Sequence, residues 1–531
     1  MKLAGAMFMY NFTAPTCDEL VQLREVAAGI RDADLIIRNS QVLCVHSGEI
    51  LERDILISGR HIAALTPPRY FFAKNTIDAK GHYAVPNFID AHFHIEYSLL
   101  TPGELARLIV PKGTTTILAD PNCMANVSGK DGVDFISATN APLCILRQIS
   151  SSVPRFPGLE LGGYSFTPED IGILLQSNSS VSLGEAVPYD FSLTSALVCA
   201  QALNAGKRIN GHTARLQEEA LWSYWAGGIC DDHNAATFSE ALNIIRLGGS
   251  VAIQSGSMTN YLKDILADPN HKMSELMLTQ IFFCADDKTV VDLNKEGHID
   301  HHVRTAISSG IDPTIAVRMA TLNAAVHFRI DHLLGSITPS KLANFMLLPD
   351  LEHIKPTSVY VCGQIVAENG EPLFANVDAI QSKFKRTIKL NKDFGVIDLA
   401  IVAPKEKSTV PVRVIEPSEG YYKKISIENM KTADGIVQQD IERDILKIAV
   451  VDRHHASRNI GVGFIKGFGL QNGAIASCNN CENQNIVVIG TDDQQMVTAV
   501  RHLEEIGGGY CVVSENNIVD SLPLPVGGIM S

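Results

Sequence analysis

The stretch Val85–Glu96 decides the fold, and it reads VPNFIDAHFHIE. It is an apolar run that ends in two histidines, His92 and His94, separated by one residue. A continuous apolar run is typical of a strand that is buried on both faces of a parallel sheet. Residues at i and i+2 of a strand point to the same side, so both imidazoles can reach one metal ion. We therefore predict a buried strand whose carboxyl end carries metal ligands.

Eight short apolar runs alternate with longer helical stretches from about residue 84 to about residue 288. Eight strand–helix units in series most simply close as a (β/α)8 barrel of about 250 residues. A doubly wound sheet is the alternative. The runs are Ala84–Ala91, Thr115–Ala119, Leu143–Ile149, Val181–Glu185, Arg208–Gly211, Gly228–Asp231, Ser250–Gln254 and Gln280–Cys284.

The regions on either side of this series read as short strands and turns. Residues 33–84 and residues 335–375 share this character, and the second region includes the strand-like runs Phe345–Leu348 and Ser358–Val361. Runs of β-branched and aromatic residues between Gly and polar clusters are typical of strands. We predict that the two regions join in one small β-sandwich domain.

The remaining boundaries follow from this division. Residues 85–334 form the predicted barrel, and residues 395–531 form a C-terminal domain. Asp312 and Pro313 predict the start of a helix after the last barrel strand. The predicted fold class is α/β: a metal-dependent (β/α)8 TIM-like barrel with a small composite β-sandwich domain and a C-terminal α/β domain.

Composition restricts the function. The chain has 531 residues, of which 46% are hydrophobic and 19% charged, a balance typical of globular proteins. Its 44 Lys and Arg against 58 Asp and Glu give a net charge of −14, which argues against nucleic acid or an anionic membrane as a partner. No apolar run reaches about 18 residues, so no transmembrane helix is expected. The 11 scattered cysteines favour free thiols in a reducing cytoplasm.

Polar residues stand at the ends of other predicted strands. Glu185 ends the fourth strand, His212 and His233 follow the fifth and sixth, and Asp286 follows the eighth. Catalytic groups of a barrel come from these carboxyl ends. Together with the first two histidines, such a set can hold two divalent ions that share a bridging carboxylate and activate a water. A single strand histidine is more often a hydrogen-bonded core residue, but the ordered set favours a metal site.

The same motifs resemble the amidohydrolase superfamily and, within it, the adenine deaminases, over about residues 33–531. The last region of the chain is distinctive of adenine deaminases, because most other amidohydrolases lack that domain. The matching stretches are Val85–Glu96, Pro111–Thr116, Ala119–Pro121, Glu296–Asp300 with Val303 and Arg304, Met319–Ala325, Asp452–His455, Asn459–Leu470 and Gly473–Ser477.

The resemblance implies hydrolytic deamination of adenine to hypoxanthine and ammonia by a metal-activated hydroxide. Glu185 would bridge the metals and Asp286 would act as a ligand and as the proton shuttle. Many relatives use a carboxylated Lys as the bridge, so Glu185 favours the deaminase branch. Mn(II) is the implied metal, with Fe(II) or Zn(II) as alternatives, in a binuclear site. The implied metal ligands are His92, His94, Glu185, His212, His233 and Asp286.

Further expectations follow from the same resemblance. The substrate is a small-molecule purine, which places the enzyme in purine salvage or adenine catabolism. We expect a cytoplasmic homo-oligomer with no nucleic-acid or membrane partner. The candidate substrate-binding residues are Glu96, Gln254, Ser255 and His298.

The chain also departs from the adenine deaminase pattern, and each departure removes a metal-ligand or acid/base group. We hypothesise that the missing groups converge beside the metal pair, as an auxiliary metal or proton-relay site that is dismantled here. Unrelated drift is the alternative. The family usually has His-Glu at Asn122-Cys123, Glu at Asn234, Arg-Glu at Gln254-Ser255, and His-Asp-Ser-His within Cys478–Gln484.

These departures leave other functions open. The chain could deaminate another aminopurine or aminoheterocycle, or hydrolyse a cyclic amide. It could also be a weakly active or non-catalytic purine-binding paralogue, although the intact histidines and carboxylates argue against that reading.

Overall fold

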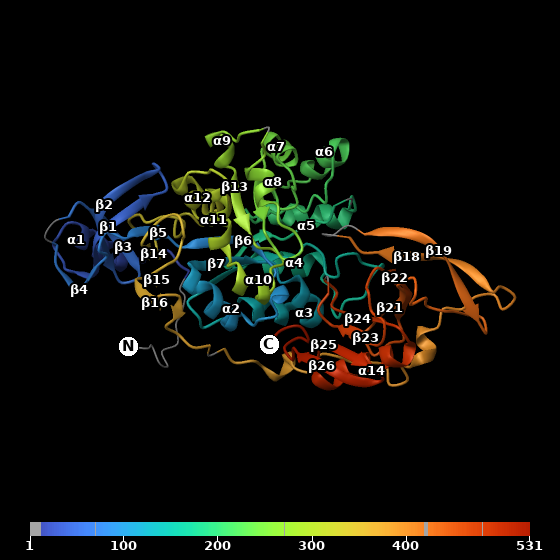
Figure 1. Cartoon of the computed structure of the whole chain (residues 1–531). Helices are drawn as coiled ribbons and strands as arrows, with labels where there is room; N and C mark the ends of the chain where they lie inside the picture. The colour runs from blue at the N-terminus through green and yellow to red at the C-terminus, as the bar shows by residue number, and fades with distance from the viewer. Residues whose placement is uncertain are drawn as a thin grey trace.

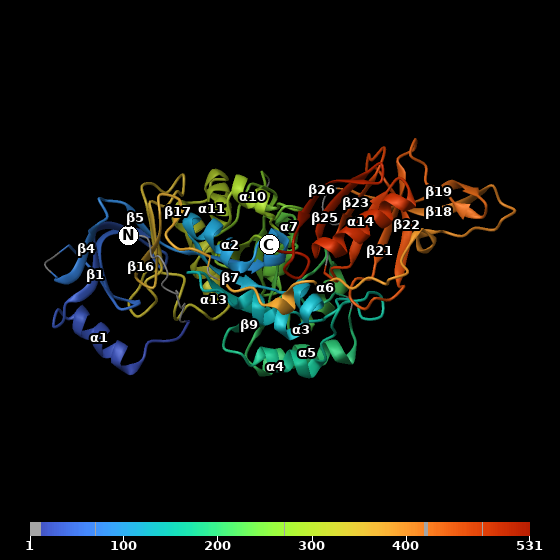
Figure 2. The same ribbon diagram turned by 90° about the horizontal axis from the view of Figure 1, so that it is seen from below.

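The structure is a computed structural model that describes residues 12–68, 71–188, 190–269, 271–376, 378–418, 423–480 and 482–531. Figure 1 shows three regions in a row. The N-terminal strands with β14–β16 lie at one end, the central helices and strands follow, and the C-terminal strands lie at the other end. The view from below in Figure 2 has the same arrangement. No helix in the described ranges is long and apolar enough to cross a membrane.

The first region is one nine-stranded sheet built from two distant segments. Strand β5 pairs with β1 on one side and with β14 on the other, so it joins the segments. Helix α1 (Cys17–Ala27) packs against β2 and β3. The strands are β1 Ala33–Cys44, β2 Glu49–Ser58, β3 His61–Thr66, β4 Ala73–Asp78, β5 Tyr83–Pro86, β14 Phe345–Leu348, β15 Ser358–Val361, β16 Gln364–Glu368 and β17 Glu371–Pro372.

The central region contains eight strands whose ladders are all parallel. They form a sheet of order β10-β9-β8-β7-β6 and a sheet of order β11-β12-β13. Backbone bonds cross both gaps, since Cys230 N donates to Ile209 O at 3.1 Å and Asp286 N donates to His92 O at 3.0 Å. The predicted α/β arrangement is confirmed. The strands are β6 Phe88–Phe93, β7 Thr114–Ala119, β8 Cys144–Ile149, β9 Ser180–Leu183, β10 Arg208–Ile209, β11 Asp231–Asp232, β12 Ser250–Gln254 and β13 Ile281–Cys284.

Helices follow these strands, and some of them bury one apolar face. In α7, for example, Phe238, Ala241 and Ile244 are buried at a spacing of three residues. Asp312 caps α12 as predicted, because its carboxylate accepts from Thr314 N at 2.8 Å. The helices are α2 Pro102–Ile109, α3 Asn122–Ser137, α4 Pro168–Leu175, α5 Leu193–Asn204, α6 Glu218–Ala226, α7 Phe238–Arg246, α8 Leu262–Leu266, α9 Glu275–Leu278, α10 Val290–Lys295, α11 Ile299–Ser308, α12 Pro313–Met319 and α13 Leu322–His327.

The prediction of a single strand over Ala84–Ala91 is wrong. β5 ends at Pro86 in the first sheet, and β6 begins at Phe88 in the central one. Asn87 lies between them and donates through Nδ2 to Tyr360 O at 2.8 Å. Apolar patterning reports burial but does not say which sheet a residue joins.

The predicted strands Arg208–Gly211 and Gly228–Asp231 are shorter in the structure, where β10 and β11 each span two residues. Gly228 has a φ of +92°, which places it in a turn and not in a strand. The predicted helix after Pro313 is likewise divided into α12 and α13.

The C-terminal region is a nine-stranded sheet covered by α14 (Asp493–Ile506), which packs on β23, β24 and β25. The segment between β23 and β24 reaches the central region. Asn479 Nδ2 donates to Glu96 O at 3.3 Å, and Asn485 Nδ2 donates to Leu161 O at 2.8 Å. The strands are β18 Thr409–Glu416, β19 Lys424–Ala433, β20 Ile436–Val437, β21 Ile445–Val451, β22 Ile460–Lys466, β23 Ala474–Ser477, β24 Ile486–Gly490, β25 Gly509–Ser514 and β26 Asn517–Pro523.

Candidate metal centre

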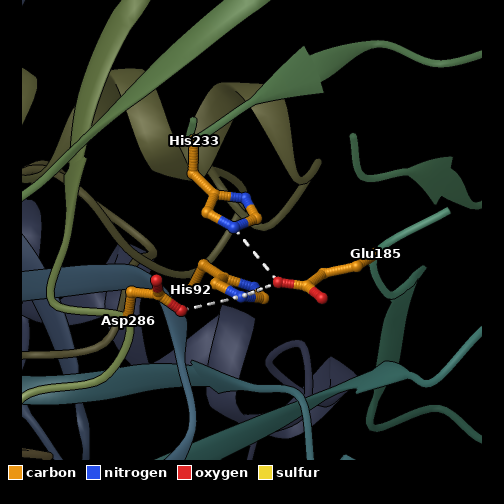
Figure 3. A group of neighbouring side chains, drawn as sticks. All are labelled: His92, Glu185, His233 and Asp286. Carbon is orange, nitrogen blue, oxygen red and sulfur yellow. Dashed lines mark ion pairs between the residues drawn. The ribbon is translucent and has the colours of Figure 1, made fainter. Parts of the chain in front are cut away.

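Six predicted ligands come together at the carboxyl ends of the central strands. Figure 3 shows four of them, with His92 and His233 directed toward Glu185 and Asp286 directed toward His92. Five of the six are buried, and His212 keeps 30% of its side chain exposed. They come from five places: His92 and His94 from the end of β6, Glu185 after β9, His212 after β10, His233 after β11 and Asp286 after β13.

One carboxylate oxygen is the focus of the cluster. Glu185 Oε1 lies near a nitrogen of each of four imidazoles, and Asp286 Oδ1 lies beside two of them. This is the donor set of a site that holds cations with a shared carboxylate. The distances from Oε1 are 3.2 Å to His92 Nε2, 3.6 Å to His94 Nε2, 3.3 Å to His212 Nδ1 and 3.1 Å to His233 Nε2. Those from Asp286 Oδ1 are 3.5 Å to His92 Nε2 and 3.3 Å to His94 Nε2.

Two acceptors fix how the strand histidines present their nitrogens. His92 Nδ1 lies 2.6 Å from Gln148 Oε1, and Gln148 Nε2 donates to Ala91 O at 2.9 Å. His94 Nδ1 lies 2.9 Å from the main-chain oxygen of Asp120. An acceptor at Nδ1 favours the tautomer that leaves the Nε2 lone pair directed at the centre, as in histidine ligands generally.

The surroundings shift the pKa values of the imidazoles and of the carboxylates in opposite directions. Burial lowers the pKa of His92, but hydrogen bonds to Asp286 and Glu185 outweigh it and raise that pKa to about 10. Burial opposes the ionised form of Glu185, yet the charges of His212 and Arg155 hold its pKa well below the ordinary value. Hydrogen bonds from the strand histidines likewise keep the pKa of Asp286 low against its burial. Cations that bind here would displace protons from the imidazoles.

The residues fit divalent ions. His212 Nδ1 and His233 Nε2 are buried atoms that make no hydrogen bond, although each lies close to Glu185 Oε1. A buried ring nitrogen without a partner is costly unless something else binds it. Neutral imidazoles and ionised carboxylates at these positions would coordinate Mn, Fe or Zn.

A cavity of about 570 Å³ opens onto this cluster. A cavity of this size accommodates a small heterocycle. Its walls come from two regions of the chain. The central region contributes His94, Tyr97, Glu185, His212, Ala214, Arg215, Asn234, Ser257, Met258, Tyr261, Asp286, Asp287 and Thr289, and the C-terminal region contributes Lys423, Asn479, Asn480, Glu482 and Tyr510.

None of the four predicted substrate-binding residues lines this cavity. Gln254 instead contacts the cluster, because its amide donates to Asp286 Oδ2. Ser255 is buried, and its main-chain oxygen accepts from Lys288 Nζ at 3.4 Å. Gln254 therefore contacts the candidate ligand Asp286 and does not line the cavity.

The other two predicted substrate residues are buried beside β6. Glu96 Oε1 accepts from Met124 N at 2.9 Å. Burial raises the pKa of Glu96 to about 7. His298 Nε2 lies 2.8 Å from Asp90 Oδ2, and its ring packs edge-on against Phe93 at 5.3 Å between centroids.

Some positions that depart from the family pattern lie on the cavity wall, and others do not. Asn234, Asn479 and Asn480 line it, and Asn122 opens helix α3 beside the Glu96 contact. Cys481 lies outside the described residues. The neutral amides therefore stand on the same side of the molecule as the retained ligands.

Two residues that contact Glu185 were not among the predicted site residues. Arg155 Nη1 lies 2.9 Å from Glu185 Oε2, and Asp120 Oδ2 accepts from Glu185 N at 3.3 Å. Arg155 stands in a loop without periodic pattern, so only the three-dimensional fold reveals its partner. Asp120 follows β7, and its place at a strand end was the available signal.

The fold and the site define a metal-dependent hydrolase of the amidohydrolase type. Residues 255–406 match the amidohydrolase family, and residues 422–531 match the adenine deaminase C-terminal domain. The chain belongs to the adenine deaminase family, as its motifs predict.

Its relatives include the adenine deaminase of Desulforamulus reducens, 38% identical over 519 residues, covering 96% of this chain and 88% of the relative. Adenine deaminase 2 of Carboxydothermus hydrogenoformans is 35% identical over 513 residues, covering 96% and 88%. The adenine deaminase of Halalkalibacterium halodurans is 34% identical over 523 residues, covering 97% and 88%.

Proposed function

We propose that this chain hydrolyses adenine to hypoxanthine and ammonia. The observation that carries the proposal is the convergence of four histidine nitrogens on Glu185 Oε1, with Asp286 beside them, at a cavity of about 570 Å³. Membership in the adenine deaminase family supports the choice of substrate.

The family implies a divalent metal, and the six clustered residues would hold it. We propose Mn(II) in a binuclear site with Glu185 as the bridge; Fe(II) and Zn(II) suit the same donors. When bound, such ions lower the pKa of a coordinated water and so provide a nucleophile near neutral pH.

Asp286 is the group that moves protons. Its Oδ2 is held by the Gln254 amide, and its Oδ1 faces the strand histidines. As an ionised carboxylate it accepts a proton from the attacking water and passes it to the departing amino group. The water oxygen remains on the purine carbon, which gives hypoxanthine, and the nitrogen leaves as ammonia.

The cavity walls suit a purine. Tyr97, Tyr261 and Tyr510 offer aromatic surface, and Asn234 and Asn480 offer amide donors and acceptors to ring nitrogens. Placed polar groups beside aromatic surface are the usual basis of ligand orientation.

A second candidate is an enzyme for another aminopurine or aminoheterocycle, or a purine-binding paralogue with weak turnover. The observation that favours it is the presence of neutral Asn234, Asn479 and Asn480 on the cavity wall, where the family pattern has acidic groups and histidine. An ionised carboxylate only accepts hydrogen bonds, whereas a neutral amide can also donate one to a ring nitrogen.

Ammonia release separates these candidates. Protein purified with Mn(II) is incubated with adenine, beside a His92→Ala control that we expect to lose metal first. Release that disappears in the control supports adenine deamination. No release from adenine by metal-loaded protein would shift the assignment to another aminoheterocycle, tested with a panel of aminopurines, or to a binding role.

We also propose a cytoplasmic location and a homo-oligomeric state. All ten cysteines of the described residues are free, which suits a reducing compartment. Light scattering of the purified protein tests the oligomeric state, since a monomeric mass would reject it.

A further inference from the structure

Glu185 is held at every polar atom except the one that faces the histidines. Its N–H donates to Asp120 Oδ2 at 3.3 Å. Its main-chain oxygen accepts from Arg155 Nη1 at 3.1 Å and from the Ser151 hydroxyl. Its Oε2 lies 2.9 Å from the same Arg155 nitrogen. Oε1 alone is left to meet the four imidazoles.

Arg155 makes two of these contacts with one buried group. The side chain is 7% exposed, and Nη1 reaches both the carboxylate and the main chain of Glu185. On its other edge, Nε lies 4.0 Å from Glu482 Oε2, which belongs to the C-terminal wall of the cavity. A planar guanidinium can donate hydrogen bonds to acceptors on two of its edges at once, whereas a lysine ammonium is a single point of charge.

We propose that Arg155 is a positioning residue of the candidate metal centre, which fixes Glu185 so that Oε1 is the oxygen presented to the four histidines. The inference rests on the proposed binuclear site. Because Oε2 is paired with the guanidinium, Oε1 would be the oxygen available to a bound cation. Groups that orient a ligand in this way typically contribute about tenfold to a hundredfold to metal affinity.

The surroundings of Arg155 make a specific test available. It also lines a separate cavity of about 630 Å³, together with Ser151 and Ser152. A free guanidinium ion can therefore approach the position that the side chain vacates in Arg155→Ala. Rescue by that ion distinguishes an orienting charge from a residue needed only for packing.

The experiment measures Mn(II) affinity of the full chain by competition with a chromophoric chelator, without substrate. We expect Arg155→Ala to bind Mn(II) at least about tenfold more weakly than wild type. Millimolar guanidinium chloride should restore part of that loss, and Arg155→Lys should lie between the two. Arg147→Ala is the matched control, because Arg147 pairs with Asp134 away from the centre.

Each result bears on a different statement. Wild-type affinity in Arg155→Ala would overturn the positioning role, and so would a loss that neither guanidinium nor Arg155→Lys relieves. If Arg155→Ala does not fold, the Mn(II) affinity of Arg155→Lys decides the question. An affinity of that variant equal to the wild-type affinity contradicts the proposal. Wild-type protein that binds no Mn(II) would instead overturn the proposed metal centre.

Discussion

At the residue scale, Asp286 combines two tasks that substitution can separate. One oxygen faces the strand histidines and the other accepts from the Gln254 amide. Asp286→Asn keeps an oxygen for the metal but removes the base. We expect the variant to retain bound Mn(II) and to lose about a hundredfold or more of kcat. Metal analysis and steady-state ammonia release measure the two effects, and an unchanged kcat would remove Asp286 from proton transfer.

Glu96 gives a prediction about stability. Burial raises its pKa from the ordinary 4.5 to about 7, so the folded state holds its proton more tightly than the unfolded chain. Its stabilising effect is present below pH 4.5 and is lost as pH rises through about 7. Relative to wild type, Glu96→Gln should therefore gain about 3 kcal/mol of unfolding free energy between these pH values.

Urea unfolding of metal-free protein at pH 4.5 and pH 8 checks the Glu96 prediction. Oε1 of the replacement can still accept from Met124 N, so the local contact is kept. Glu505→Gln, at a position whose side chain is 74% exposed, controls for the substitution itself. A difference between Glu96→Gln and wild type that does not change with pH would contradict the assignment.

At the scale of elements, α14 is tied to the C-terminal sheet by a buried ion pair. Lys447 on β21 is 2% exposed, and its Nζ lies 2.6 Å and 2.8 Å from the two oxygens of Asp493 at the start of α14. Removing one partner leaves a buried charge, so Asp493→Ala should cost about 3 kcal/mol. Lys447→Met combined with Asp493→Leu should recover most of that loss, as replacing both partners often does.

A urea midpoint from far-UV circular dichroism measures the Asp493 series. The double variant is the informative control, because it removes the same contact without leaving a charge behind. A double variant as unstable as Asp493→Ala would mean that the loss comes from helix packing and not from the unpaired lysine.

Elements also show what the sequence can and cannot predict. The apolar runs at Phe345–Leu348 and Ser358–Val361 predict strands, and β14 and β15 have these bounds. Their short length favours strands over helices, a choice that periodicity alone does not decide. Asn87 divides an equally apolar run between two sheets, which depends on long-range pairing. Arg155 was missed for the same reason: its partner, Glu185, lies on a different strand end.

At the scale of the whole molecule, the site is a joint product of two regions. The central strands supply the candidate ligands, which their positions at strand ends predict, and the C-terminal region closes the cavity with Asn479, Asn480 and Glu482. The contact of Asn479 with Glu96 O shows how the two regions meet. Sequence motifs located both parts, but which residues face the cavity follows only from how the regions dock.

Metal binding should therefore stabilise the molecule as a whole, and more so at higher pH. In the metal-free protein the pKa of His92 is raised from 6.5 to about 10, so its stabilising effect is full below pH 6.5 and is lost as pH rises through about 10. A bound cation needs the neutral imidazole and takes over that stabilisation. At a free Mn(II) concentration a hundred times the dissociation constant, binding adds about 2.7 kcal/mol to the free energy of unfolding.

Thermal unfolding with Mn(II) and with a chelator, at steps from pH 6.5 to 9, measures this effect. The difference in Tm between the two conditions should widen with pH in the wild type, and His92→Ala should show little difference at any pH. A difference that stays constant would mean that metal and protons do not compete for these histidines.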